Sequence, residues 1–163
     1  MTDRARTRAV ALKSADGFLA FGFGSGLSPV APGTAGSLAA VPLALPLAFL
    51  PWSGALALIT MAFIFGVWLC GRVGRRLGVH DHSGIVFDEF VGLWLVLVCV
   101  PFYWGWWLAA FVLFRIFDAA KPWPINWFDR RIHGGLGVML DDLLAAGFAL
   151  ACLMIAEAIL AGL

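Results

Sequence analysis

Long apolar runs alternate with short charged blocks along the 163 residues of this chain. Asp, Glu, Lys and Arg are absent from Gly17 to Gly71 and from Phe90 to Phe114, and only Glu157 follows Asp142. The remaining charges fall in three blocks, at residues 3–16, 72–89 and 115–142. Runs of this kind predict apolar helices. We place about five of them, roughly at residues 36–50, 54–71, 88–101, 105–120 and 140–161.

Composition places these helices in a membrane. Hydrophobic residues make up 62% of the chain and charged residues 13%, whereas a soluble domain carries about 25% charged residues. We therefore expect an all-α, polytopic membrane helical bundle, with a basic cytoplasmic tail at residues 1–16 and a single membrane-embedded domain at residues 17–163. A bilayer core needs about 20 helical residues. Several runs are shorter, so some helices are expected to be re-entrant or interfacial, and four spans plus an interfacial helix is the alternative.

The turns between the helices predict which side each charged block faces. Proline ends helices, so Pro51 and Pro101 mark two tight links between helices. Neither link carries a charge. If the N-terminus is cytoplasmic, every Lys and Arg lies on the cytoplasmic side, as the positive-inside rule requires. One face of the bundle therefore collects nearly all ionisable groups.

The net charge of +1 excludes a polyelectrolyte surface for nucleic acid.

The block at residues 115–142 is the densest in chemistry. Ionisable groups beside a membrane interior are costly, so a balanced cluster there indicates a functional site. Carboxylates at the starts of different helices suit Mg²⁺, and phosphate and water then complete its coordination shell. The basic groups suit an anion, although a network of structural salt bridges is the alternative. The acids and the bases of this block are Asp118, Asp129, Asp141, Asp142, Arg115, Lys121, Arg130 and Arg131.

A glycine-rich segment, GFGSGLSPVAPGTAGS at residues 22–37, precedes the first confident helix. Exposed N–H groups and hydroxyls at a helix start can bind an anion, and Thr34 and Ser37 supply such hydroxyls. We also expect Thr34 to cap the helix. A re-entrant turn with ordinary capping explains the segment equally well.

The second charged block ends on Asp88 and Glu89, where an apolar run begins. Acids at a helix N-terminus are favoured by the macrodipole, but two adjacent acids at a membrane edge also indicate a bound cation. His80 and His82 flank Asp81 nearby. That cluster suits metal binding or proton transfer, or is simply an exposed polar loop.

The ordered motifs resemble the phosphatidylglycerophosphatase A family. The matching strings are GFGSGLSPVAPGTAGSLAA, GVHDHSGIVFDEFVG, FRIFDAAKPWPINWFDR and HGGLGVMLDDLLAAG, and they span about residues 18–150. The resemblance implies a multi-pass enzyme of the bacterial inner membrane with its active site on the cytoplasmic side. It also implies Mg²⁺-dependent removal of the terminal phosphate of the phospholipid phosphatidylglycerophosphate, to give phosphatidylglycerol.

Residue types and the resemblance together suggest roles for the polar residues. We expect metal-bound water to attack the phosphate, with the metal held by Asp88, Glu89, Asp141 and Asp142, and a covalent phospho-aspartate is the alternative. The expected catalytic groups are Asp118, Asp129 and Lys121. The expected substrate-binding groups are Thr34, Ser37, Arg115, Lys121, Arg130 and His82.

Two other functions compete with this interpretation. A CDP-alcohol phosphatidyltransferase also uses acids and metal at a membrane edge, but its D-G-x2-A-R signature is missing from the chain. A small membrane transporter or channel with an acidic cation site is the non-enzymatic alternative. Such a protein places its acids near the middle of the membrane, whereas these acids cluster at one edge. The oligomeric state does not follow from the sequence.

Overall fold

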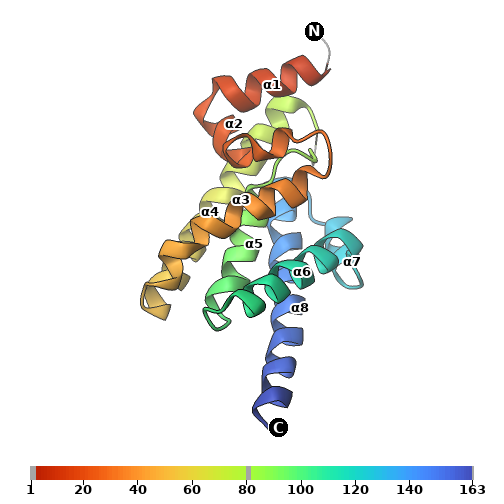
Figure 1. Ribbon diagram of the computed structural model, residues 1–163. Helices are drawn as coiled ribbons and strands as arrows, with labels where there is room; N and C mark the ends of the chain where they lie inside the picture. The colour runs from red at the N-terminus through yellow and green to blue at the C-terminus, as the bar shows by residue number, and fades with distance from the viewer. Residues whose placement is uncertain (1–2, 80–81, 163) are drawn as a thin grey trace.

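The computed structural model describes residues 3–79 and 82–162, and every regular element in these ranges is a helix. The all-α expectation is therefore confirmed. His80 and Asp81 lie outside the described residues. In chain order (Figure 1) the elements are α1 Asp3–Lys13, α2 Ala15–Ala20, η1 Gly22–Leu27, α3 Pro32–Ala48, α4 Trp52–Leu77, α5 Phe87–Val98, α6 Trp104–Ala120, α7 Ile125–Asp129 and α8 Gly135–Ala161.

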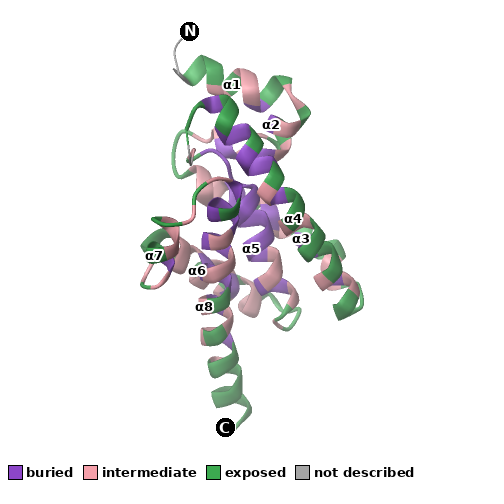
Figure 2. Cartoon of the chain, turned by 180° about the vertical axis from the view of Figure 1, so that it is seen from behind, coloured by how far each residue is buried: buried purple, intermediate pink, exposed green. Residues whose placement is uncertain are grey.

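Helix α5 forms the centre of the bundle. It packs against α3, α4, α6 and α8, and its first turns are buried from Phe87 to Leu93. One apolar cluster joins it to α4 and α2, and a second joins it to α3, α6 and α8. Burial is concentrated around α5, while the far ends of α3 and α8 are largely exposed (Figure 2). The acids that open α5 are therefore held inside the protein.

Close contact between α4 and α8 fixes where α8 begins. A Cβ on Gly135 would overlap the carbonyl oxygen of Val67 in α4, and Gly71 lies on the other side of the same contact. Only glycine permits so close an approach of two backbones. The contact sets the first turn of α8 against α4 and thereby positions the acids one to two turns later in α8.

Two helices are long and apolar enough to cross a membrane in the part of the chain that the structure describes, α4 and α8. Five spans are therefore not confirmed. Helix α5 has 12 residues, which is about 18 Å of helix at 1.5 Å per residue, against a hydrocarbon core of about 30 Å. Helix α3 has 17 residues with Pro42 and Pro46 inside it, and α6 ends in the charged Arg115–Asp118 turn.

Helix boundaries differ from the expected ones at both ends, and the largest difference is at the end of α4, which reaches Leu77 rather than residue 71. Helix α3 begins at Pro32, with Ala31 in the left-handed region (φ 46°) and no side-chain cap. The expected capping by Thr34 is therefore wrong, because proline, which favours the first helical turn, starts the helix earlier. Helix α8 begins at Gly135, so Asp141 and Asp142 lie in its second turn rather than at its start.

The basic N-terminal segment is helical over α1 and packs against α2 and α4. Asp16 in α2 links this region to α4 through Arg72 Nε at 2.9 Å and Arg76 Nη1 at 2.7 Å. Burial opposes ionisation of Asp16, but the hydrogen bond from Arg72 and the charge of Arg76 lower its pKa to about 2. Folding of α2 onto α4 therefore favours the ionised form of Asp16.

We expect Asp16→Asn to lower the thermal stability of the protein at pH 7 by about 1 kcal/mol or less. The arginine side chains are 46% and 43% exposed, and ion pairs so close to solvent are screened. Because the folded pKa of Asp16 is depressed from 3.8 to about 2, its stabilisation is present above pH 4 and fades as the pH falls toward 2. Thermal unfolding in detergent between these pH values checks this; identical melting temperatures at pH 7 would contradict it.

Candidate active site

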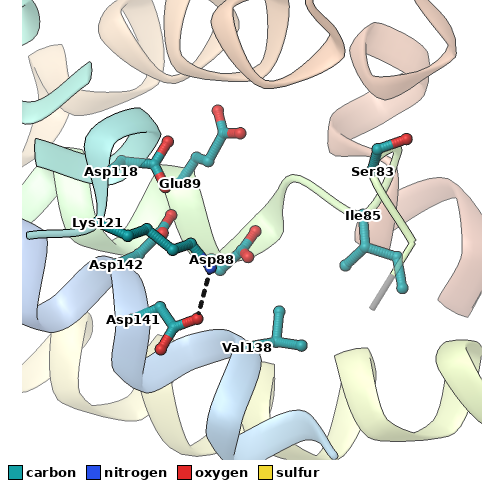
Figure 3. A pocket seen from close by; sticks show the side chains of 9 residues that line it. All are labelled: Ser83, Ile85, Asp88, Glu89, Asp118, Lys121, Val138, Asp141 and Asp142. Carbon is teal, nitrogen blue, oxygen red and sulfur yellow. Dashed lines mark hydrogen bonds and ion pairs between the residues drawn. The ribbon is translucent and has the colours of Figure 1, made fainter. Parts of the chain in front are cut away.

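Six ionisable side chains from three parts of the chain line a small cavity of about 130 Å³. Five of them are carboxylic acids and one is a lysine, so the cavity carries a large excess of negative charge when the acids are ionised. Ser83, Ile85 and Val138 complete the lining. Figure 3 shows these side chains gathered around one space; the ionisable ones are Asp88, Glu89, Asp118, Lys121, Asp141 and Asp142.

Three helices supply the acids. Asp88 and Glu89 lie in the first turn of α5, Asp118 near the end of α6, and Asp141 with Asp142 in the second turn of α8. The side chains of α5 and α8 that carry these charges are nearly buried, with Asp142 only 3% exposed. Buried carboxylates are costly unless paired or ligated. Their convergence therefore indicates a site rather than a solvated surface.

Lys121 provides the cation of the cavity. It ends α6 in the left-handed region (φ 40°), where Pro122 prevents the helix from continuing. Its Nζ donates to Asp141 Oδ2 at 2.8 Å and lies 3.4 Å from Asp129 Oδ1. Burial alone would lower the pKa of Lys121, but the hydrogen bond to Asp141 and the charges of Asp141 and Asp129 raise it above its usual value. The lysine therefore stays positively charged.

Arg115 stands behind the cavity and ties three elements together. Its Nη1 lies 3.3 Å from Glu89 Oε1, forms a short ion pair with Asp118 Oδ2, and donates to Ser37 Oγ at 3.5 Å. Ser37 Oγ in turn donates to Glu89 Oε2 at 2.7 Å. The strongest effect on Glu89 is burial, which raises its pKa to about 7 although Arg115 and Ser37 lower it. Arg115 therefore holds both Glu89 and Asp118 in place.

The glycine-rich segment packs against the contacts that Arg115 makes with Glu89. A Cβ on Gly33 would overlap Glu89 Oε1 and approach Arg115 Nη2 to 3.0 Å. The start of α3 therefore lies directly against the Glu89–Arg115 pair. The anion site expected from this segment has another explanation: its glycines let α3 approach two buried charges.

The donor set of the cavity fits a hard divalent cation. Asp141 Oδ1 and Asp142 Oδ2 are buried and have no hydrogen-bond partner among the described residues, and carboxylate oxygen is the ligand that Mg²⁺ prefers. The charges of Asp88, Asp118 and Glu89 repel that of Asp142, which a cation would offset. As the side chains now stand, no three acidic, His or Cys groups among the described residues lie close enough to hold a metal. Ligation therefore requires side-chain rotations.

The remaining expected site residues lie elsewhere. Asp129, on α7, does not line the cavity but lies 3.4 Å from Lys121, which does. Thr34, within α3, and Arg130, after α7, do not line it. The His82 ring lies 3.3 Å from Thr7 Oγ1 and accepts from the Gly84 N–H at 3.0 Å, which places it in the loop before α5.

Ser83 lines the cavity but was missed by sequence reasoning. Serine is common in loops, so the only sequence signal for Ser83 is its position in the charged block before Asp88.

Known proteins resemble this chain over most of its length. A family model described as phosphatidylglycerophosphatase A matches residues 18–157. A protein named phosphatidylglycerophosphatase A from Escherichia coli (strain K12) is 52% identical over 128 residues, covering 78% of this chain and 74% of the relative. A protein of the same name from Haemophilus influenzae is 45% identical over 151 residues, covering 91% of this chain and 93% of the relative.

A further relative differs in name. A protein from Bacteroides thetaiotaomicron called a putative phosphatidylinositol-3-phosphatase is 41% identical over 145 residues, covering 83% of this chain and 89% of the relative. No solved structure matches the chain. The family model covers all six ionisable residues of the cavity, and the chain belongs to the phosphatidylglycerophosphatase A family.

Proposed function

We propose that this protein is a Mg²⁺-dependent lipid phosphatase that hydrolyses the terminal phosphomonoester of phosphatidylglycerophosphate to phosphatidylglycerol and phosphate. The observation that carries the proposal is the acidic cavity with one fixed ammonium, formed by motifs that lie within the family match. Hydrolysis of a phosphomonoester needs the charge of the phosphate neutralised and a water molecule oriented for attack. A cavity of this composition offers groups for both tasks.

Lys121 binds a phosphate oxygen in this proposal. Asp141 orients its ammonium group through the 2.8 Å hydrogen bond, and Asp129 supports it from the other side. A bound phosphate would replace part of this pairing, since three donors are available on a lysine ammonium. The lysine is thereby positioned before the substrate arrives, which lowers the cost of reorganisation during the reaction.

Asp118 is the proposed base. It lines the cavity and is held by Arg115, so one of its oxygens is fixed while the carboxylate accepts the proton of the attacking water. The water oxygen bonds to phosphorus, the bond from phosphorus to the glycerol oxygen breaks, and that oxygen takes up a proton. Mg²⁺ held by Asp88, Asp141 and Asp142 would polarise the phosphoryl oxygens and lower the pKa of water beside it.

Glu89 and Ser37 have supporting roles in this proposal rather than direct ones. Glu89 lines the cavity but its oxygens are engaged by Arg115 and Ser37, and Ser37 does not line the cavity. Residues that orient the groups around a metal are typically worth about 10–100-fold in activity. They are therefore positioning residues, whereas Asp88, Asp142 and Lys121 contact the reacting groups.

The proposed location is the bacterial inner membrane, with α4 and α8 crossing it and the cavity at the cytoplasmic face. Only 33% and 22% of the apolar windows of α4 and α8 are buried in the protein, whereas the core helix of a soluble domain is mostly buried. Large apolar side chains such as Met154, Ile155 and Ile159 are more than half exposed along α8. Basic side chains at the end of α4 favour a cytoplasmic location for that end.

Phosphate release by the purified full chain tests the function. We expect turnover of phosphatidylglycerophosphate in Mg²⁺, loss of turnover after exhaustive chelation, and recovery when Mg²⁺ is restored. Phosphatidylinositol 3-phosphate is the comparison substrate, because one relative is named a putative phosphatidylinositol-3-phosphatase. Turnover that survives chelation contradicts the metal role. Faster release from the inositol lipid contradicts the proposed substrate, and ion transport in liposomes without phosphate release contradicts the enzyme altogether.

A further inference from the structure

A second hollow lies away from the acidic cavity, between α1 and the end of α4. Its volume is about 430 Å³, within the range of about 300–1,000 Å³ typical of small-ligand pockets. In contrast to the acidic cavity, three cationic side chains and no acid line it. The lining residues, which we call the basic groove, are Arg6, Ala9, Val10, Lys13, Ser14 and Arg76.

The basic groove combines an apolar wall with fixed positive charge. Ala9 and Val10 supply the apolar surface, and Ser14 does not offer its proton outward because its hydroxyl donates to the Val10 carbonyl at 2.8 Å. Arg6 Nη2 donates to the Arg76 carbonyl at 2.6 Å, which fastens α1 to α4. The groove is therefore a formed feature of the fold rather than a gap between mobile side chains.

Two of the three cations retain donors for a ligand. Arg76 uses Nη1 to bind Asp16, and a guanidinium group has five N–H donors in all. Lys13 ends α1 with its side chain exposed. An apolar wall beside such cations matches an amphiphile with an anionic head, because basic side chains bury their stems against apolar surface while their charges stay outside.

The position of the groove matches the headgroup level of a membrane. Helix α1 lies across the end of α4, at the opposite end of the molecule from the C-terminus of α8 (Figure 1). Helix α4 is one of the two candidate spans, and its last turns carry Arg72, Arg75 and Arg76. If α4 crosses the membrane, these turns lie where phospholipid headgroups lie. The exposed side chain of Leu12, 58% accessible, lies on the same helix α1.

We propose that the basic groove binds the headgroup phosphate of an anionic phospholipid, as a second lipid site separate from the acidic cavity. The phosphate lies between Lys13 and the two arginines, and the apolar wall receives the start of the lipid chain. The inference uses the membrane location of α4 from the proposed function, but it does not depend on the reaction. Its consequence is that a bound lipid would hold α1 against the membrane surface.

Native mass spectrometry of the full chain in detergent tests this site. The probes are phosphatidylserine and phosphatidylcholine with the same acyl chains, titrated separately. We expect tighter binding of the anionic lipid and a weakening of at least about fivefold in Lys13→Glu, because a basic group near a membrane surface is worth about 1 kcal/mol. Arg4→Glu is the matched control, since Arg4 lies on the same helix, is exposed and does not line the groove. The control should bind as the unmodified protein does.

Several outcomes overturn the proposal. Equal weakening by Lys13→Glu and Arg4→Glu indicates general charge attraction instead of a site, and no weakening by Lys13→Glu removes the groove. Displacement of the lipid by millimolar glycerol 3-phosphate indicates a soluble phosphate ligand, and displacement by an acidic peptide indicates a protein partner. Phosphate release by the unmodified protein, measured in parallel, reports on the proposed function alone, so the two ideas fail separately.

Discussion

Replacing Asp142 by asparagine should reduce phosphate release at least about a hundredfold while leaving the fold intact. A catalytic metal supplies several kcal/mol of transition-state stabilisation, and each 1.4 kcal/mol is a tenfold change in rate. Asp142 is 3% exposed and has a buried oxygen without a hydrogen-bond partner among the described residues. An amide keeps the volume of this side chain but is a poor ligand for Mg²⁺ in place of a carboxylate.

The same substitution should raise the melting temperature measured without metal. Burial, and after it the charges of Asp88, Asp118 and Glu89, disfavour the ionised form of Asp142, so a side chain that is always neutral removes this cost. Adding Mg²⁺ should stabilise the unmodified protein and have little effect on Asp142→Asn, because binding to the folded state alone raises apparent stability. Thermal unfolding with and without Mg²⁺ measures this independently of activity.

Glu157→Gln is the matched control for both measurements. It removes an acid from the same helix α8, but Glu157 is exposed and far along the helix from the cavity. Its activity and its response to Mg²⁺ should equal those of the unmodified protein. Near-normal turnover in Asp142→Asn, or an equal response to Mg²⁺ in both variants, would remove Asp142 from the site.

The pattern of charges along the sequence was sufficient to identify the ionisable residues that line the cavity, but not their roles. Burying a charge is costly in any folded protein, so acids beside apolar runs could be singled out without a structure. Asp88, Glu89, Asp118, Lys121, Asp141 and Asp142 do line one cavity. Their catalytic and metal-binding roles stay predictions.

The expected substrate-binding residues show why sequence spacing alone does not predict which groups a side chain contacts. Arg115 and Ser37 were expected to bind substrate, which stays a prediction, and the structure shows in addition that both contact Glu89. No sequence pattern distinguishes an arginine that faces a ligand from one that neutralises a buried acid, because both lie near carboxylates. The pairing with Glu89 appears only in three dimensions, and it depends on the approach of α3 that Gly33 permits.

The count of five spans is not confirmed for a related reason. Apolar periodicity reports which residues avoid water, not whether protein or lipid covers them. Helix α5 is apolar because four other helices cover it, whereas α8 is apolar with only 22% of its window covered by protein. A sequence pattern does not distinguish these two cases. The two helices differ in length, with 12 residues in α5 and 27 in α8, but length depends on boundaries that the pattern locates poorly.

Replacing Arg115 by alanine should unfold or strongly destabilise the protein, by about 3–5 kcal/mol, because breaking a buried ion pair from one side leaves uncompensated charge. Arg115 is paired with both Glu89 and Asp118, so two acids lose their partner at once. Activity should be lost with the fold. Chemical or thermal unfolding of the purified variant measures the destabilisation.

Arg115→Lys separates the positioning role from simple charge balance. A lysine ammonium keeps the charge but lacks the planar fork of a guanidinium, so it does not hold two carboxylates in one fixed geometry. We expect a folded protein whose turnover number falls about 10–100-fold while its KM for the lipid changes little. A large rise in KM with unchanged turnover would show instead that Arg115 binds substrate directly. The double variant Arg115→Ala/Glu89→Gln should recover part of the stability lost in Arg115→Ala, because it removes one of the two uncompensated charges.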